Sequence, residues 1–270
     1  MKTEPGFLRV TRLGPSAEIL EIALDRPGAL NAISTAFASQ LTEVTAEAAR
    51  DDSVRVVVLT STSPRAFCVG ADLKERQQMS DVEMLAHREI SRGAYRGVLD
   101  LPMPSVAVVE GYALGGGLEL ALSCDLIVAG EQSVVGLPEV SVGLIPGGGG
   151  TQLLARKVGR SRAASMIFTA ERQSASAAAE LGVLDYLTPT GGARTRALQL
   201  AESIARNSPT SVRNAKSAMR LGLDAGLLAG LEIEDSFWRA TATSEDRREG
   251  ITAFNEKRSP RWHPLAAERD

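Results

Sequence analysis

The chain has 270 residues, with 44% hydrophobic and 23% charged side chains and a formal net charge of −3. This composition predicts a soluble globular protein with room for one large core, and the low net charge excludes a surface built to grip nucleic acid or an anionic membrane. With two histidines and two cysteines, the sequence contains no HExxH or CxxC motif, and it has no serine-hydrolase elbow or complete nucleotide-binding loop. We therefore expect carboxylates to carry any acid–base chemistry, and we expect no metal site.

The ends and the most apolar region of the chain bear on its location. Residues 1–20 hold several charges and no continuous apolar stretch, so we expect no signal peptide. Residues 101–130 are the most apolar region, but Glu110, Glu119 and Asp125 interrupt them, so we expect no membrane-spanning segment. The predicted location is the cytoplasm.

Short apolar runs alternate with helical stretches over the first two-thirds of the chain. Val, Ile and Leu dominate the predicted strands, which are Ile19–Leu24, Val54–Thr60, Ser105–Val109 and Leu126–Ala129. Helices are predicted between them over Ser34–Arg50 and Asp81–Leu99. Because two of the strands are nearly continuous apolar runs, we expect them to be buried on both faces, in an α/β core with crossover connections.

From about Ser161 the pattern becomes almost wholly helical. One predicted helix, Leu227–Thr243, carries an apolar stripe. Another follows Ser244 as its N-cap, with Lys257 and Arg258 in its last turn. This tail predicts self-association, with packing of the same stripe on the chain's own core as the alternative.

Residues 111–121 (GYALGGGLELA) join three glycines to the start of a helix. Free amides at such a start favour an oxyanion, although glycine-rich helix starts also occur for packing reasons alone. Glu119 lies three residues after Gly116, so both share one helix face and the carboxylate tilts toward the glycine amide. A carboxylate surrounded by leucines and alanine is uncommon unless it is paired or functional.

Two further segments stand out, residues 66–75 (AFCVGADLKE) after a predicted strand and residues 136–150, which end in four glycines. Taken alone, Glu139 in the second segment is typical of a surface loop. The glycine run at 147–150 is typical of a tight turn into a helix beginning at Thr151. Glu110, at the end of a strand, fits a solvated or capping role.

Together these segments resemble the enoyl-CoA hydratase/isomerase (crotonase) superfamily, from Leu24-Asp25-Arg26-Pro27-Gly28-Ala29-Leu30-Asn31-Ala32 to Phe254-Asn255-Glu256-Lys257-Arg258. The resemblance implies an α/β fold, a crotonase-like spiral of ββα units with a helical C-terminal region. We place the spiral core and active site in residues 1–200 and a helical trimerisation region in residues 201–270.

Within the superfamily, residues 70–76 (GADLKER) and 147–152 (GGGGTQ) are similar to the AU-rich-RNA-binding methylglutaconyl-CoA hydratase type. That type contacts RNA through a lysine-rich helix. The matching stretch here, residues 41–53, contains no lysine, so we expect no nucleic-acid binding.

The resemblance also implies which residues form the site. The backbone amides of Ala71 and Gly116 would bind the thioester carbonyl as an oxyanion hole. Glu119 and Glu139 match the two glutamates of the family's hydratases, whereas its isomerases usually keep only the second. Contacts to the substrate and its CoA moiety are implied for Arg26, Ala29, Ala71, Asp72, Leu73, Lys74, Gly116 and Lys257, the last across a subunit boundary.

The implied activity is syn addition of water to a 2-enoyl-CoA, giving a 3-hydroxyacyl-CoA, as in the β-oxidation of fatty acids. No cofactor is implied, because coenzyme A is part of the substrate, and the implied assembly is a homotrimer or a hexamer made of two trimers. The alternatives are an enoyl-CoA isomerase, a hydratase for branched 3-methylglutaconyl-CoA, or a non-catalytic protein that binds acyl-CoA or RNA. We expect the pocket walls to come from residues 75–100 and the C-terminal helices.

Overall fold

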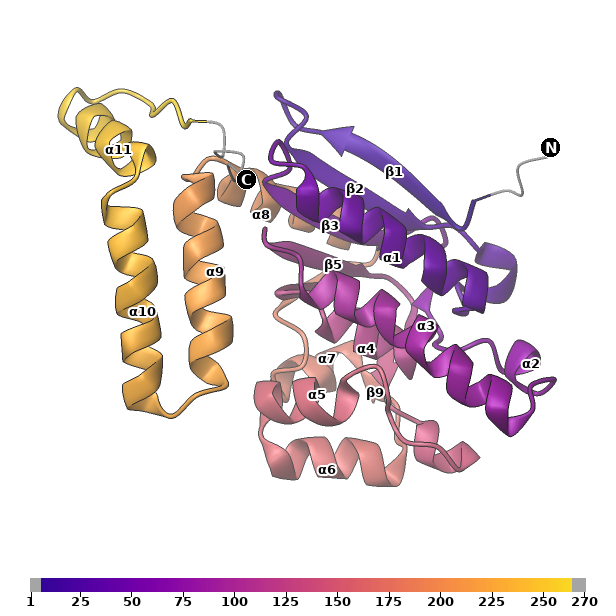
Figure 1. Cartoon of the computed structure of the whole chain (residues 1–270). Helices are drawn as coiled ribbons and strands as arrows, with labels where there is room; N and C mark the ends of the chain where they lie inside the picture. The colour runs from indigo at the N-terminus through magenta and orange to yellow at the C-terminus, as the bar shows by residue number, and fades with distance from the viewer. Residues whose placement is uncertain (1–5, 264–270) are drawn as a thin grey trace.

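A computed structural model describes residues 6–263. Residues 1–5 of the segment expected to lack a signal peptide lie outside the described residues, as do residues 264–270 of the predicted C-terminal region. The chain forms two sheets (Figure 1). In sheet order, the six-stranded sheet consists of β1 (Leu8–Leu13), β2 (Ile19–Leu24), β3 (Val56–Ser61), β5 (Ser105–Val109), β7 (Leu126–Gly130) and β10 (Tyr186–Thr188). The four-stranded sheet consists of β4 (Ala66–Cys68), β6 (Tyr112–Leu114), β8 (Val134–Gly136) and β9 (Gln173–Ser174).

The helices follow the strands in a repeating order. They are α1 (Thr35–Arg50), α2 (Leu73–Arg76), α3 (Asp81–Leu99), α4 (Gly116–Leu122), α5 (Gly150–Val158), α6 (Arg160–Thr169), α7 (Ala175–Glu180), α8 (Ala193–Ala205), α9 (Pro209–Leu223), α10 (Leu227–Ala242) and α11 (Glu245–Asn255). Two 3-10 turns, η1 (Pro27–Ala29) and η2 (Glu139–Val142), interrupt loops.

Three consecutive strand–strand–helix units build the core. The first strands of the units, β3, β5 and β7, are parallel neighbours in the large sheet, and the second strands, β4, β6 and β8, are parallel neighbours in the small one. Each second strand leads toward a helix or turn, namely α2, α4 and η2. This arrangement confirms the predicted spiral of ββα units. Because β4, β6 and β8 are parallel, the segments that follow them lie at the same edge of the small sheet.

The central strands β3 and β5 of the large sheet are buried on both faces, as their apolar sequences predict. Val56 and Val58 of β3 pack with the alanines of α8, whereas Val57 and Leu59 face the main core shared with α1, α3 and α4. Successive side chains of a strand point to opposite faces, so a strand sandwiched between two helical layers has no polar face. Glu110 follows β5, and its Oε1 accepts hydrogen bonds from the amides of Gly191 and Ala193 at the start of α8, which is the predicted capping role.

The C-terminal helices differ in detail from the sequence prediction. Residues after 161 include the short strands β9 and β10, so this region is less uniformly helical than expected. Lys257 was also predicted inside the last helix, and this is wrong, because α11 ends at Asn255. Lys257 takes a left-handed conformation with φ 54°, and the amides of Lys257 and Arg258 donate to the carbonyls of Phe254 and Ala253, a pattern that terminates a helix.

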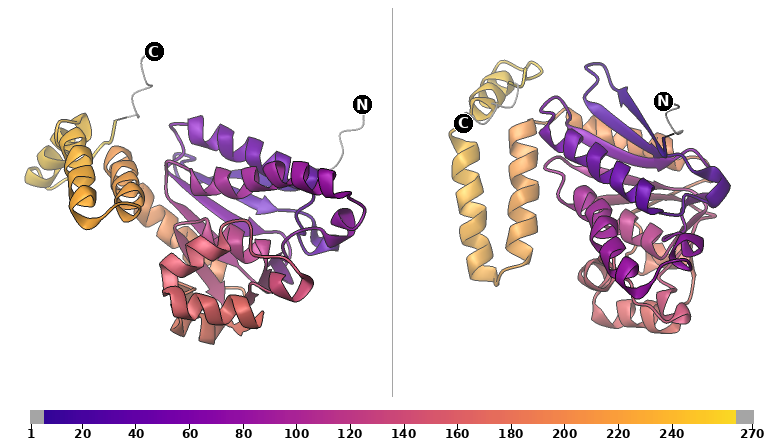
Figure 2. Two further views of the ribbon diagram at one scale, coloured as in Figure 1. Left: turned by 60° about the horizontal axis from the view of Figure 1, so that its bottom comes forward. Right: turned by 45° about the vertical axis from the view of Figure 1, so that its right-hand side comes forward.

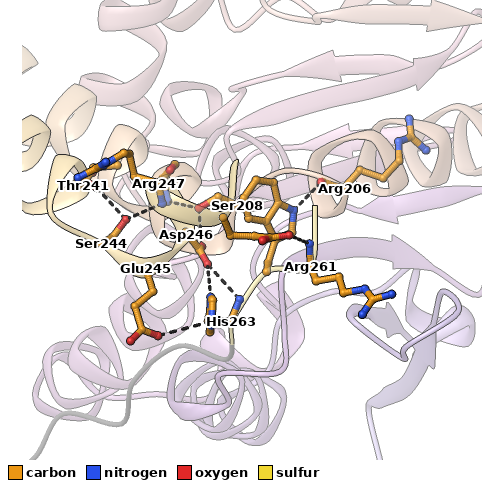
Figure 3. Close-up of polar contacts among 12 residues, drawn as sticks. Arg206, Ser208, Thr241, Ser244, Glu245, Asp246, Arg247, Arg261 and His263 are labelled. Atoms are coloured by element: carbon orange, nitrogen blue, oxygen red, sulfur yellow. Dashed lines mark hydrogen bonds and ion pairs between the residues drawn. The ribbon is translucent and has the colours of Figure 1, made fainter. Parts of the chain in front are cut away.

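Helices α9 and α10 form an antiparallel hairpin beside the core, with α11 across one end (Figures 1 and 2). A polar cluster ties α11 to the turn before α9 (Figure 3). Buried Asp246 accepts hydrogen bonds from the Ser208 hydroxyl (2.6 Å) and from the His263 amide (3.0 Å). Within residues 6–263, no helix combines the length and apolar content that crossing a membrane requires.

Candidate active site

A cavity of about 560 Å³ opens where the segments after β4, β6 and β8 meet α3. Its walls come from residues 69–76, from one face of α3, from the start of α4 and from the loop at 138–148, with Arg172 at the edge. Five residues singled out in the sequence line this cavity, namely Ala71, Leu73, Gly116, Glu119 and Glu139.

Glu119 is a buried carboxylate in a helix with no exposed residue. Its side chain is 3% exposed, and its Oε1 accepts hydrogen bonds from the amides of Gly148 (2.7 Å) and Gly150 (2.8 Å). Burial raises the pKa of Glu119 above its ordinary value, although these two amides act in the opposite direction. The carboxylate is therefore held in place through one oxygen.

The glycine run at 147–150 has a role that sequence reasoning missed. The predicted turn is present and α5 begins at Gly150, but the run also supplies the two amides that hold Glu119. A Cβ at Gly148 would lie 2.8 Å from Oε2 of Glu119 and 2.8 Å from the ring of Tyr95, so this position leaves no room for a side chain. The four consecutive glycines were the signal in the sequence for this role, because a run of glycines lets the backbone approach another group closely.

Arg88 of α3 forms a hydrogen bond to the same turn. Its guanidinium donates a hydrogen bond to the carbonyl of Gly147 at 2.5 Å, directly before the glycines that hold Glu119. Arg88 therefore links the helix that walls the cavity to the loop that positions a carboxylate.

Glu139 is the first residue of η2 and lies in the cavity wall rather than on a surface loop. Its carboxylate packs against Gly115, where a Cβ would come within 3.0 Å of Oε1. Within the part of the chain that the structure describes, its buried Oε2 has no hydrogen-bond partner. Burial is the largest cause that raises the pKa of Glu139, to about 7; its own backbone amide opposes the rise and the charge of Glu119 adds to it.

The amides of Ala71 and Gly116 lie on adjacent backbone segments. Gly70 takes φ 89°, and a Cβ there would lie 2.8 Å from the nitrogen of Gly116. The pairing of Ile33 with this segment uses the Gly70 carbonyl and the Asp72 amide, and among residues 6–263 the Ala71 amide between them donates to no backbone carbonyl. Gly116, as the first residue of α4, has no helical acceptor for its amide. Two neighbouring donors of this kind can bind one carbonyl oxygen.

Four of the residues implied to contact substrate do not line the cavity, namely Arg26, Ala29, Asp72 and Lys74. Arg26 forms an ion pair with Asp72 at 2.7 Å, and Asp72 also accepts from the first amides of α2, including that of Lys74. These contacts hold the segment carrying Ala29 against the segment carrying Ala71. Burial raises the pKa of Asp72, but the hydrogen bonds and the charge of Arg26 outweigh it and hold that pKa below its usual value.

Lys257 is the implied contact that the single chain does not bring to the cavity. It follows α11, which lies at the opposite end of the molecule from α2 (Figure 1). A role across a subunit boundary stays a prediction.

One face of α3 forms the remaining wall. The spacing of its cavity-lining residues places them along one side of the helix. They include Met84, His87, Arg88, Ser91 and Tyr95. The expectation that residues 75–100 supply pocket walls is confirmed. The expected contribution of the C-terminal helices is wrong for the described chain, because no residue of α9, α10 or α11 lines this cavity.

The arrangement points to acid–base chemistry beside a polarised carbonyl. Two carboxylates of raised pKa and two free amides surround one space, which is suited to moving protons at carbon next to a carbonyl. Burial raises the pKa of the Cys68 and Cys124 thiols to about 12, so neither is a ready thiolate. Among residues 6–263, no three His, Cys, Asp or Glu side chains gather in a way that could hold a metal ion.

Comparison with known proteins gives consistent matches over most of the chain. The family model described as enoyl-CoA hydratase/isomerase matches residues 14–264. A probable mitochondrial enoyl-CoA hydratase 2 of Arabidopsis thaliana is 40% identical over 95% of this chain and 85% of its own length. Human mitochondrial methylglutaconyl-CoA hydratase is 37% identical over 97% of this chain and 78% of its own length. The crystal structure of enoyl-CoA hydratase from Bacillus anthracis superposes with a TM-score of 0.92 at 37% identity, covering 95% of this chain and 98% of that one.

Proposed function

Because the chain belongs to the enoyl-CoA hydratase/isomerase family, we propose that it is an enoyl-CoA hydratase that adds water syn across the 2,3 double bond of a 2-enoyl-CoA. The product is the 3-hydroxyacyl-CoA. The observation that carries this proposal is that Glu119 and Glu139 line one cavity together with the free amides of Ala71 and Gly116.

The substrate's thioester carbonyl accepts hydrogen bonds from the amides of Ala71 and Gly116. These donors polarise the conjugated double bond and stabilise the enolate that forms when a nucleophile attacks C3. Removing one such donor from an enzyme typically lowers its rate by about 100–1000-fold. No cofactor takes part in this proposal, because coenzyme A enters as part of the substrate.

The two glutamates divide the proton transfers. Ionised Glu119 takes a proton from water while the water oxygen forms its bond to C3, and the electrons of the double bond move toward the carbonyl. Protonated Glu139 then gives its proton to C2 as the carbonyl re-forms. The proton left on Glu119 returns to Glu139 directly or through solvent, which restores both groups.

The pKa values support this division of roles. A pKa of about 7 leaves Glu139 partly protonated near neutral pH, as an acid requires, whereas hydrogen bonds from two amides favour the ionised form of Glu119. Each acid or base role is worth on the order of 100–10,000-fold in rate.

The direct test is to incubate the protein with crotonyl-CoA and follow the loss of the conjugated-thioester absorbance while identifying the product. We expect 3-hydroxybutyryl-CoA, carrying one deuterium at C2 when the reaction runs in D2O. Absorbance that does not change, alongside conversion of a 3-enoyl-CoA to its 2-enoyl isomer, would show an isomerase instead. Stoichiometric acyl-CoA binding without turnover of either thioester would show a binding protein.

The assembly and location are further proposals. We propose a homotrimer or a hexamer of two trimers, supported by the apolar surface on the C-terminal helices. We propose the cytoplasm as the location; the Arabidopsis and human relatives are named as mitochondrial, and fractionation of the source cells distinguishes the two.

A further inference from the structure

His87 is a buried histidine without a partner on the cavity-lining face of α3. His87 is 5% exposed and lines the cavity, and neither of its ring nitrogens has a hydrogen-bond partner within residues 6–263. A neutral imidazole carries one donor and one acceptor, and leaving such groups buried and unpaired is unfavourable. A histidine in this condition on a cavity wall calls for a ligand that supplies the partner.

Arg76 lies beside His87 and is also incompletely satisfied. It ends α2, lines the same cavity, and its buried Nε has no hydrogen-bond partner in the described part of the chain. The charged groups that act on His87 are Arg76 and Glu75, and burial together with the Arg76 charge holds the pKa of His87 below its usual value. Glu75 is already engaged, because its carboxylate accepts the Thr35 amide at the start of α1 (2.9 Å).

Two other charged groups of the cavity are already engaged. Arg88 is committed to the Gly147 carbonyl, and Glu119 is held by two glycine amides. Arg76 also acts on Glu119 and Glu139, where its charge lowers both pKa values against the effect of burial. Among residues 6–263, none of the ion pairs involves Arg76. An acyl chain with an apolar end would cover Arg76 and His87 without giving either a partner.

We propose that this cavity takes a 2-enoyl thioester whose acyl chain ends in a carboxylate, with Arg76 and His87 as the residues that recognise that carboxylate. This inference rests on the proposed hydratase function and names its substrate class. The ligand carboxylate accepts from the Nε–H of Arg76 and from a ring N–H of His87, so it supplies both missing partners at once. Charge-assisted hydrogen bonds of this kind are the strong ones in protein sites.

The test compares thioesters that match in length and differ only at the chain end. Turnover is measured with glutaconyl-CoA against pent-2-enoyl-CoA, and binding with the saturated pair glutaryl-CoA against pentanoyl-CoA by calorimetry. We expect the carboxylate-ended member to be preferred by about 10–100-fold in kcat/KM and in Kd, as one or two charge-assisted hydrogen bonds imply. Arg76→Met and His87→Leu should each reduce the ratio of kcat/KM between glutaconyl-CoA and pent-2-enoyl-CoA, mostly through a higher KM for glutaconyl-CoA.

The matched control is Arg92→Met, because Arg92 is an exposed arginine on α3 outside the cavity that pairs with Glu89. It should leave the preference unchanged. Equal or better use of the uncharged thioester by the wild type would overturn the inference and leave the hydratase proposal standing. An Arg76→Met variant that loses kcat equally on both thioesters would also overturn it, because Arg76 would then serve the glutamates alone. A binding preference for glutaryl-CoA without any hydration would instead support this recognition site and contradict the hydratase proposal.

Discussion

Among single residues, the cavity contains two carboxylates, Glu119 and Glu139, whose pKa values are raised by burial. At Glu119, two glycine amides that bind one carboxylate oxygen oppose the rise in pKa that burial causes, whereas the pKa of Glu139 rises to about 7. The sequence could single out Glu119, because a carboxylate in an apolar helix is conspicuous. Glu139 could be recognised only through family resemblance, since its own neighbours are those of an ordinary turn.

The first prediction concerns pH. Because kcat/KM reports the free enzyme, hydration should fall as pH rises through about 7, where Glu139 loses the proton it must donate. It should also fall on the acid side, as Glu119 becomes protonated above its usual carboxyl pKa. The measurement is a pH profile of kcat/KM for wild type and Glu139→Gln. A wild-type profile flat up to about pH 9 would contradict the acid role of Glu139.

The second prediction concerns the glycine turn. Gly148→Ala places a Cβ 2.8 Å from Oε2 of Glu119, so the carboxylate must shift and kcat should fall by about 100-fold or more. Gly147→Ala is the control within the same run, because its Cβ would make only ordinary contacts with Arg88 at 3.5 Å. Equal kcat in the two variants would show that the turn does not position Glu119.

At the scale of elements, the long segments were predictable and the short ones were not. β2, β5 and α3 begin and end where the apolar runs and the helical pattern place them. The three-residue strands of the small sheet are too short to show a period, and they are defined by pairing between segments far apart in the chain. These same strands set the positions of Ala71, Gly116 and Glu139, so the assembly of the site could not be read from local pattern.

The third prediction tests the packing of α4 on β4. A Cβ at Gly117 would come 1.9 Å from the Cys68 carbonyl oxygen, so the helix must move away from the strand. Gly117→Ala should lower the free energy of unfolding by about 3 kcal/mol or more, through overpacking of a tight contact. Gly28→Ala, whose Cβ would meet nothing within 4 Å, is the control. Thermal unfolding at a fixed protein concentration measures both, and equal melting temperatures would refute the close packing.

At the scale of the whole molecule, the helical hairpin leaves an apolar surface uncovered in the single chain. Leu227 and Leu228 at the start of α10 are 78% and 80% exposed, and Trp238 lies on the same helix. Exposed apolar surface of this extent marks an interaction site in most proteins. The apolar stripe was visible in the sequence, but only the structure shows that the chain's own core does not cover it.

The fourth prediction follows from that surface. Light scattering after size exclusion should give the mass of a trimer or hexamer for the wild type and a smaller mass for Leu227→Glu with Leu231→Glu, because buried unpaired charges oppose association. Val10→Glu on the edge strand β1, also at an exposed apolar position, should leave the mass unchanged. A monomeric wild type at micromolar concentration would contradict the proposed assembly.

Glu119 and Glu139 should act together on one substrate. The measurement that tests this is kcat/KM for crotonyl-CoA hydration in Glu119→Gln, Glu139→Gln and the double variant. Each single change should cost about 100–10,000-fold, and the double variant should lose less than the product of the two, because the groups act as a unit. Glu131→Gln, an exposed carboxylate away from the cavity, should hydrate at the wild-type rate. Near wild-type hydration by either single active-site variant would contradict the account.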